Sequence, residues 1–460
     1  MAETSTATKR DMGTDIISSL PDTLLCHILS FLPTLDAVRT SFLSRRWRHL
    51  WKDLQVFDFD IRGRGIIRSS ESFVLFVDTV LSQRRFPDIR KFSLFCERLD
   101  DPNAFRRWMH AAVGPCLQEI YLGFGDYKSR DGIDGLFTCD SLVSLSLQSD
   151  FDLNDVPSIH LPLLKNLELP SGVSVNSKLI SGCPVLENLS FFASGRLCPK
   201  ISLLSPSLKR LELIDEREYK HPIINEIQID APNLEFLRIY LDETCAKTFI
   251  ISNFPNIMEA FIEIAPMAEH VDWVPKLVRA LSNSKKLYLG GYTIECLVRA
   301  PYLRLPEFSC LRHLSIWFIN FNSRVLIKLL RCCPKLQVLD IDNTGGDEIP
   351  WHHIPPVPSR WTQPASVPGC VMSRLKIVEF RRCPDSSEQW ELFAYILQNA
   401  LALKEIIIYT YNNPWAKETD TVSHEKQKEH ILKEISVFPR ASSICRVEEF
   451  TCRKRYDYSD

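Results

Sequence analysis

The chain has 460 residues, of which 45% are hydrophobic and 24% are charged, and its formal net charge is −2. These proportions are typical of a folded, soluble protein. The sequence has no excess of basic residues, which argues against nucleic acid or a membrane surface as a partner. The 15 cysteines contain no CxxC pair, which argues against a secreted disulfide framework. With no signal-peptide pattern and no run of about 20 apolar residues, we expect a cytoplasmic or nuclear protein, or both.

The N-terminal residues change from a polar leader to a helical module. Residues 1–12 are small and polar, so we expect them to be disordered. In residues 13–60, a first helix is predicted to begin at Pro21 and Asp22, with Asp22 as a cap, and to end at Pro33. Its apolar face is formed by Leu24, Leu25, Ile28, Leu29 and Leu32.

Two further short helices are predicted before residue 60. Thr34 or Asp36 can cap the second, and Ser44 can cap the third. Their apolar positions are Leu35, Val38 and Phe42, and then Trp47, Leu50 and Trp51. A unit of this size cannot build a self-sufficient core, so either it lends apolar surface to a partner or it packs as a cap on the rest of this chain.

A repeated L-x-x-L-x-L spacing dominates residues 61–365 and is strongest over residues 117–343. A helix from Ser69 to Leu81 precedes it. The clearest units begin at positions 22 residues apart, namely Leu142, Leu164, Leu186 and Leu208. Further units include Leu117-Ile120-Leu122, Leu234-Leu237-Ile239, Ile257-Ala260-Ile262, Ser284-Leu287-Leu289, Leu311-Leu314-Ile316 and Leu336-Leu339-Ile341.

This spacing is that of leucine-rich repeats, in which each unit contributes one short strand and a return segment to a shared core. We therefore predict an α/β fold, with a leucine-rich-repeat solenoid whose parallel sheet lines its concave side. An ordinary α/β domain with buried strands is the alternative, but it does not explain the near-constant interval. Polar strand positions facing the concave surface are the candidates for contacting a target, and they include Ser146, Glu168, Ser190, Glu212, Arg238, Tyr288, Ser315 and Asp340.

The repeat pattern breaks after Ile341 and returns near residue 375. The Pro-rich residues 345–370 are expected to form a loop, because no helix or strand can run far through them. Residues 366–445 contain two further repeat-like units, an amphipathic helix from Ser387 to Ala400 and a charged helix from Lys417 to Ile435. We expect residues 446–460 to form a charged tail.

Two segments resemble known domains. The run LPDTLLCHILSFLP at residues 20–33, followed by DAVRTSFLSRRWRHLW at residues 36–51, resembles an F-box. The segments RLKIVEF at 374–380, LKEI at 403–406 and FPRAS at 438–442 resemble the FBD domain of plant F-box proteins. Together with the repeats, nearly the whole chain resembles the plant F-box/LRR/FBD family.

The resemblance implies a role in ubiquitin transfer. In this family the F-box binds a Skp-type adaptor, which links to a cullin and a RING subunit, while the repeats hold a target protein. The resemblance places adaptor-binding residues at Leu20, Pro21, Leu24, Ile28, Leu29, Val38, Leu43, Arg45 and Trp47. The chain is then a non-catalytic substrate receptor of an SCF-type ubiquitin ligase. A scaffold that does not lead to proteolysis is the alternative, and the target protein is not identified.

Catalytic and metal-binding motifs are weak in this sequence. Asp340 and Asp342 begin a pattern like a calcium loop, but its twelfth position is Trp351 instead of Glu. His352 and His353 have no Cys or Glu at a spacing typical of metal ligands. Cys26 lies within the packing pattern of the first helix, so we expect it to fill space there and not to act as a nucleophile. We expect no metal, no cofactor and no enzyme activity. The basic pairs Lys285-Lys286 and Arg381-Arg382 are expected to be solvated surface.

Overall fold

The structure is a computed structural model, and it divides the chain into an N-terminal unit, Met1–Glu168, and a C-terminal unit, Leu169–Asp460. It describes residues 17–60, 69–125, 132–148, 156, 158–169, 177–192, 200–214, 226–244, 248–252, 254–266, 273–300, 304–343, 359–381, 386–411, 435 and 437–452. The leader expected at residues 1–12 lies outside these residues. No described helix is long and apolar enough to cross a membrane.

The N-terminal unit opens with a small helical module. Its elements are η1 (Ile17–Ser19), α1 (Asp22–Leu29), α2 (Thr34–Arg39), η2 (Thr40–Phe42) and η3 (Trp47–Asp53), where η marks a 3-10 helix. The third expected helix is therefore a 3-10 helix, and Arg46 precedes it instead of Ser44. Leu25, Leu29, Trp47, Leu50 and Trp51 form the core of the module, and each is at most 7% exposed.

The helix starts in this module differ from the expected caps. Pro21 and Pro33 occupy the N-cap positions of α1 and α2, and neither helix has a side-chain cap. Asp22 is instead an ion-pair partner of Arg46, and the buried Thr34 hydroxyl accepts a hydrogen bond from the backbone N–H of Asp58. The proline ring fixes φ at the start of each helix, but it supplies no side-chain acceptor for the first N–H groups of α1 and α2.

Five parallel strands follow, the last of which ends at Leu169, one residue beyond the N-terminal unit. They are β1 (Val56–Asp60), β2 (Lys91–Cys96), β3 (Glu119–Phe124), β4 (Ser144–Leu147) and β5 (Asn166–Leu169), paired in this order. The return segments include α3 (Ser70–Gln83), α4 (Pro102–Ala112) and η4 (Asp134–Thr138). Ser69 caps α3, where its hydroxyl accepts from the N–H of Ser72, so the helix expected from residue 69 is confirmed.

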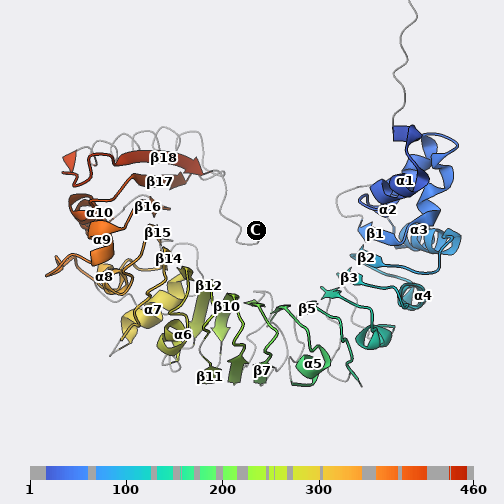
Figure 1. The fold of residues 1–460 in the computed structure, drawn as a ribbon, viewed down its shortest axis with the longest axis horizontal. Coiled ribbons are helices and arrows are strands. Elements are labelled where there is room, and N and C mark those ends of the chain that lie inside the picture. The colour runs from blue at the N-terminus through green and yellow to red at the C-terminus, as the bar shows by residue number, and fades with distance from the viewer. Residues whose placement is uncertain are drawn as a thin grey trace, which may run out of the picture. The chain divides into compact units, whose positions relative to one another are not determined.

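The C-terminal unit continues the same construction (Figure 1). Its parallel sheet runs in the order β6 (Asn188–Phe192), β8 (Arg210–Ile214), β10 (Phe236–Thr244), β12 (Glu259–Pro266), β13 (Lys286–Leu289), β14 (His313–Phe318), β15 (Val338–Asn343), β16 (Ile377–Phe380), β17 (Glu405–Tyr411) and β18 (Arg446–Cys452). The predicted α/β fold with a parallel sheet built from repeats is confirmed.

The return segments of the C-terminal unit are of two kinds. Three of them are strands that form a second parallel sheet, with β9 (Glu226–Asp230) between β7 (Lys200–Leu204) and β11 (Thr248–Ile251). The others include α5 (Ser177–Gly182), α6 (Val274–Ala280), α7 (Gly291–Arg299), α8 (Ser323–Arg331), α9 (Gly369–Ser373) and α10 (Ser387–Asn399). Figure 1 shows the helices α6 to α10 along one side of the main strands.

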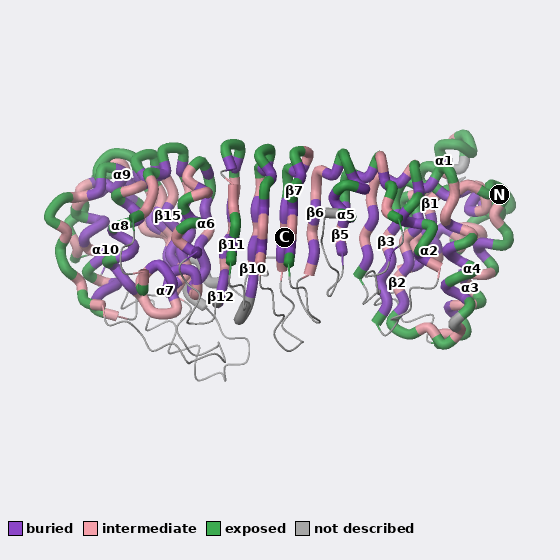
Figure 2. Tube along the Cα trace, turned by 90° about the horizontal axis from the view of Figure 1, so that it is seen from below, coloured by how far each residue is buried: buried purple, intermediate pink, exposed green. Residues whose placement is uncertain are grey.

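The core follows the leucine positions of the repeat. Each apolar position of the four units that begin at Leu142, Leu164, Leu186 and Leu208 is at most 2% exposed. Figure 2 shows buried and less buried residues alternating along the strands, as the side chains of a strand point to opposite faces. Full burial of one such side chain stabilises the folded chain by about 2 kcal/mol relative to leaving it exposed. The apolar positions of the repeat therefore supply most of the hydrophobic stabilisation of each unit.

The segment after residue 343 differs in part from expectation. Residues 345–358 of the expected loop lie outside the described residues, and α9 already begins at Gly369. The helix expected at Ser387–Ala400 is confirmed as α10, with a capping box between Ser386 and Gln389. The helix expected over Lys417–Ile435 falls almost wholly outside the described residues. The expected charged tail begins with a strand, β18, which pairs with β17.

Candidate functional site

The N-terminal module exposes an unusual amount of apolar surface. Within residues 24–43, six large apolar side chains are at least 38% exposed, namely Leu24, Ile28, Phe31, Leu32, Phe42 and Leu43. Phe42, which was predicted among the apolar positions of the second helix, is 88% exposed. We call these six residues the apolar face. A module that leaves so many apolar side chains in water has a surface suited to a protein partner.

The other residues predicted for adaptor binding occupy different environments. Pro21 and Arg45 are exposed beside the apolar face, and Leu20 and Val38 are partly buried. Leu29 and Trp47 are 1% and 5% exposed. Since these two side chains are buried in the module core, they support the surface from within and are not available for contact in this structure.

Arg46 ties the start of α1 to the segment that begins η3. Its Nη2 atom lies 2.7 Å from Oδ1 of Asp22 and also donates to the carbonyl oxygen of Leu20. The Cys26 thiol, in α1, donates to the carbonyl oxygen of Leu50 over 3.6 Å. These links join segments about 25 residues apart and hold the helices that carry the apolar face.

The second surface is the face of the parallel sheet that carries the polar strand positions, which we call the ladder face. Among the described residues, its side chains are largely paired with each other. In the N-terminal unit, Glu168 accepts from the hydroxyl of Ser146 over 2.5 Å and from the amide of Gln148 over 3.2 Å. In the C-terminal unit, Glu212 lies 3.6 Å from Arg238, a residue of the next strand in the sheet.

Aromatic rings form the middle of the ladder face in the C-terminal unit. Phe261 and Tyr288, on neighbouring strands, stack with centroids 3.9 Å apart and an angle of 4° between their planes. Phe236 packs on one side of this pair and His313 on the other, at 5.7 and 5.5 Å. The guanidinium of Arg238 lies 5.1 Å from the Phe261 ring centroid, so this surface already holds a cation against an aromatic ring.

Ionised side chains meet on the strands that follow. The hydroxyl of Ser315 donates to Oδ2 of Asp340 over 3.0 Å, and Nε of Arg381 donates to the same oxygen over 2.8 Å. Arg381 also lies 3.7 Å from Glu379, and its guanidinium is 5.6 Å from the ring centroid of Tyr409. Asp340 and Ser315 are each 2% exposed. We call Tyr288, His313, Ser315, Asp340, Glu379 and Arg381 the ladder cluster.

Burial shifts the pKa values in the ladder cluster. Burial, together with the nearby carboxylates of Glu259 and Asp340, raises the pKa of Tyr288 to about 12. Burial and the charge of Asp340 raise the pKa of Glu379, and burial lowers the pKa of His313. Each shift favours the neutral form, as is usual for ionisable groups withdrawn from water.

The sequence predicted part of this cluster. Tyr288, Ser315 and Asp340 had been named, and the structure brings them together on the adjacent strands β13, β14 and β15. His313 and Glu379 were missed, although the alternation of side chains along β14 and β16 places them on the same face. Arg381 had been expected in solvent, but its side chain is only 22% exposed because it is paired with Asp340.

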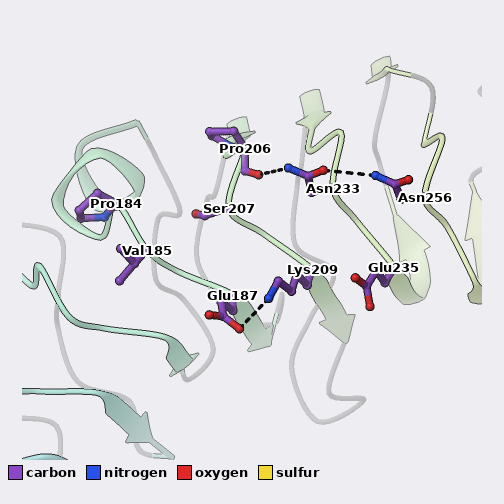
Figure 3. A pocket seen from close by; sticks show the side chains of 9 residues that line it. All are labelled: Pro184, Val185, Glu187, Pro206, Ser207, Lys209, Asn233, Glu235 and Asn256. Carbon is purple, nitrogen blue, oxygen red and sulfur yellow. Dashed lines mark hydrogen bonds and ion pairs between the residues drawn. The ribbon is translucent and has the colours of Figure 1, made fainter.

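A shallow pocket lies elsewhere, on the turns that precede strands β6, β8, β10 and β12 (Figure 3). Its volume is about 350 Å³. The amide of Asn233 donates to the carbonyl of Pro206 over 2.8 Å, and the amide of Asn256 donates to Oδ1 of Asn233 over 3.2 Å. These asparagines link successive repeats, so the polar lining serves the solenoid itself.

The described residues were expected to hold no metal, and their buried cysteines are held as thiols. No group of three or more His, Cys, Asp or Glu suited to a metal is found within the described residues. Asp340, from the weak calcium-like pattern, is instead bound by Ser315 and Arg381. Burial raises the pKa of Cys333 and raises that of Cys370 to about 11, which keeps these thiols protonated and unreactive near neutral pH.

Three families of known proteins match parts of this chain. Residues 17–59 match the F-box domain, and residues 363–408 match the FBD domain. Residues 105–258 match the LRR repeats of FBD-associated F-box protein At5g56370. The F-box match contains the apolar face, the FBD match covers α9 and α10, and the LRR match covers the strands from β3 to β10.

Relatives from Arabidopsis thaliana extend over nearly the whole chain. FBD-associated F-box protein At4g10400 is 31% identical over 447 residues, which cover 94% of this chain and 99% of the relative. F-box/LRR-repeat protein 13 is 31% identical over 462 residues, which cover 94% and 96%. FBD-associated F-box protein At5g38590 is 30% identical over 409 residues, which cover 86% and 93%.

Proposed function

Because the chain belongs to the family of plant F-box proteins that carry leucine-rich repeats and an FBD domain, we propose that it is the substrate-recognition subunit of an SCF-type ubiquitin ligase. In this role the F-box binds a Skp-type adaptor, and through it a cullin and a RING subunit. The repeats bind a target protein, and a separate enzyme transfers ubiquitin. The chain itself contributes recognition and position.

The apolar face is the observation that carries the proposed adaptor contact. It presents Phe31, Phe42 and Leu43 at 75, 88 and 69% exposure. Aromatic and aliphatic side chains that are exposed together stabilise a complex when a partner removes them from water, at about 25 cal/mol per Å² of apolar surface. We therefore narrow the proposed contact to the apolar face with Pro21 and Arg45, and assign Leu29 and Trp47 to its support.

The ladder face supports the proposed target contact. It offers polar, aromatic and charged side chains on successive parallel strands, spaced by the regular register of the sheet. A surface of this kind can contact an extended segment of another protein at several points. Residues Glu212, Arg238, Tyr288, Ser315 and Asp340 lie on it in the C-terminal unit, and Glu168 lies on it in the N-terminal unit.

Co-purification with a Skp-type adaptor tests the adaptor contact. We expect the full chain to bind the adaptor, and the double variant Ile28→Asp with Leu43→Asp to lose this binding. Leu75→Asp is the matched control, because Leu75 in α3 is 69% exposed and lies outside the F-box. If the wild-type chain does not bind, or if the double variant binds as well as the control, the proposed adaptor contact is wrong.

The ligase role requires a second measurement. A chain that lacks residues 17–59 retains the repeats and should hold target proteins without delivering them. We expect proteins captured by this form to have longer half-lives in its presence than in the presence of the full chain. If captured proteins have the same half-life with both forms, the chain acts as a scaffold and the ligase role is wrong.

A further inference from the structure

A run of basic side chains lies in the C-terminal unit, on the side of the main sheet at which the strands begin. We call these residues the basic rim, and they are Lys285, Arg312, Lys335, Arg374, Lys376 and Lys404. They lie just before β13, β14, β15, β16 and β17, and each of them is exposed. Figure 2 shows the turns at this side of the strands as exposed. The basic rim shares no residue with the apolar face or the ladder cluster.

Backbone hydrogen bonds place four of these basic residues in one row. The N–H of Arg312 donates to the carbonyl oxygen of Lys285 over 2.9 Å, and the N–H of Lys404 donates to that of Lys376 over 2.8 Å. Gln337 lies between the two pairs, because its N–H donates to the carbonyl oxygen of Arg312 and its own carbonyl accepts from the N–H of Lys376. Neighbouring strands are about 4.8 Å apart, so the row from Lys285 to Lys404 extends over about 19 Å.

The cations of the basic rim are not neutralised within the part of the chain that the structure describes. No side-chain hydrogen bond or ion pair joins any of the six to another described residue. The same positions of the preceding strands differ, because Glu187, Lys209 and Glu235 follow one another there, and Nζ of Lys209 lies 3.1 Å from Oε2 of Glu187. From β13 to β17 no acidic residue occupies the row. An acidic partner therefore meets these cations without displacing an internal one.

Apolar side chains are exposed beside the basic rim. Met372, Leu401 and Ile444 are 45, 65 and 62% exposed, and they lie shortly before β16, β17 and β18. The described turns that carry the basic rim expose no aromatic ring. Proteins that bind single-stranded nucleic acid combine cations with aromatic rings on which the bases stack. Cations beside aliphatic side chains instead suit a protein segment that is both acidic and apolar.

We propose that the basic rim binds an acidic segment of a partner protein that also carries apolar side chains. An extended segment rises about 3.3 Å per residue, so about six residues reach from Lys285 to Lys404. Its carboxylates pair with the cations of the row, and its apolar side chains pack on Met372 and Leu401. This inference goes beyond the proposed function, because it assigns a third binding surface that depends on neither the adaptor contact nor the ladder face.

Binding of a fluorescein-labelled peptide that alternates glutamate and leucine, measured by fluorescence anisotropy on the full chain, tests the proposal. We expect the double variant Lys376→Glu with Lys404→Glu to lower the affinity at least about tenfold, since two ion pairs are lost and two like-charge contacts are added. Lys276→Glu with Lys328→Glu is the matched control, because it changes the net charge equally at exposed positions of α6 and α8. If both double variants lower the affinity equally, the attraction is diffuse and the proposal is wrong.

Two further measurements test the chemistry of the partner. A peptide that alternates glutamate and serine should bind more weakly than the glutamate–leucine peptide, because it buries no apolar surface. Leu401→Ser should weaken binding of the glutamate–leucine peptide and leave binding of the glutamate–serine peptide unchanged. A single-stranded DNA oligonucleotide of mixed sequence should bind more weakly than the glutamate–leucine peptide. Equal binding of the two peptides, or tighter binding of the oligonucleotide, overturns the proposal.

Discussion

Arg381 donates through Nε to Oδ2 of Asp340 over 2.8 Å, although Asp340 is 2% exposed and the two residues are 41 positions apart in the sequence. The pair joins β15 to the residue that follows β16. The backbone reinforces this link, because the N–H of Arg381 donates to the carbonyl oxygen of Ile341 over 2.8 Å. A buried carboxylate in this position depends on its cation.

Replacing Arg381 by methionine should destabilise the chain. The change leaves the buried charge of Asp340 with the hydroxyl of Ser315 as its remaining partner, and losing one member of a buried ion pair costs about 3–5 kcal/mol. Because Arg381 is partly exposed, we expect about 2–3 kcal/mol in urea denaturation. Arg312→Met, at an exposed position of the same unit, is the control and should change stability little. Equal stability of the two variants would contradict a structural role for the pair.

Glu379 should make stability depend on pH. Burial and the charge of Asp340 raise the pKa of Glu379 above its ordinary value of 4.5, so the folded chain holds this proton more tightly than the unfolded chain. The stability from this group is fully present below pH 4.5 and is lost as the pH rises through the raised value. We expect Glu379→Gln to increase Tm at pH 7 by about 1–2 °C, which corresponds to about 1 kcal/mol in a chain of this length, and to leave Tm unchanged at pH 4.

The matched control for this prediction is Glu235→Gln. Its carboxylate is exposed, so the same substitution should leave Tm unchanged at both pH values. If Glu379→Gln lowers Tm at pH 7, the hydrogen bonds that the carboxylate accepts outweigh the cost of its burial, and the assigned cause of the pKa shift does not govern stability.

The strands of the main sheet could be predicted from the sequence because one repeated spacing places two apolar side chains of each strand in the core. The second sheet was missed for a related reason. Its strands alternate apolar and polar residues, as in Ile201 and Leu203 or Ile227 and Ile229, but this two-residue period lies between the repeats and is short. A search for alternation within each return segment would have found it.

The side-chain surfaces were less predictable than the strands. Phe42 was expected on the second helix, whereas that helix ends at Arg39, and Phe42 lies in the 3-10 helix η2 with its side chain 88% exposed. Arg381 was expected in solvent because its local sequence is basic. Its partner Asp340 belongs to the preceding strand of the sheet, and such pairings depend on register, which local composition does not report.

Replacing Gly290 by alanine should destabilise the chain, because it disturbs a contact at the start of helix α7. A Cβ atom at this position would lie 1.3 Å from Oε2 of Glu263, whose Oε1 accepts from the backbone N–H of Tyr292 over 3.1 Å. The carboxylate would have to move, and the N-terminus of α7 would lose an acceptor, at a cost of about 1–2 kcal/mol. Thermal unfolding measures this cost.

A double-mutant cycle separates the cause of that loss. If displacement of the Glu263 carboxylate is responsible, Gly290→Ala should cost much less when Glu263 is already alanine, since no carboxylate remains to be displaced. Costs that are the same in both backgrounds would mean that the backbone at residue 290, and not the contact with Glu263, makes alanine unfavourable.

Glu388, at the start of α10, should be required to hold this helix against α8. It is 9% exposed and accepts from the backbone N–H of Ser323 over 3.1 Å, from the hydroxyl of Ser359 over 2.7 Å and from the hydroxyl of Ser323. Ser323 is the first residue of α8, so the carboxylate also meets the positive end of that helix dipole. Glu388→Ala leaves buried donors without an acceptor, and we expect a loss of about 2–4 kcal/mol in urea denaturation. Glu391→Ala, on the exposed side of α10, should cost little; if both substitutions cost the same, helix propensity and not this hydrogen-bonded link determines the loss.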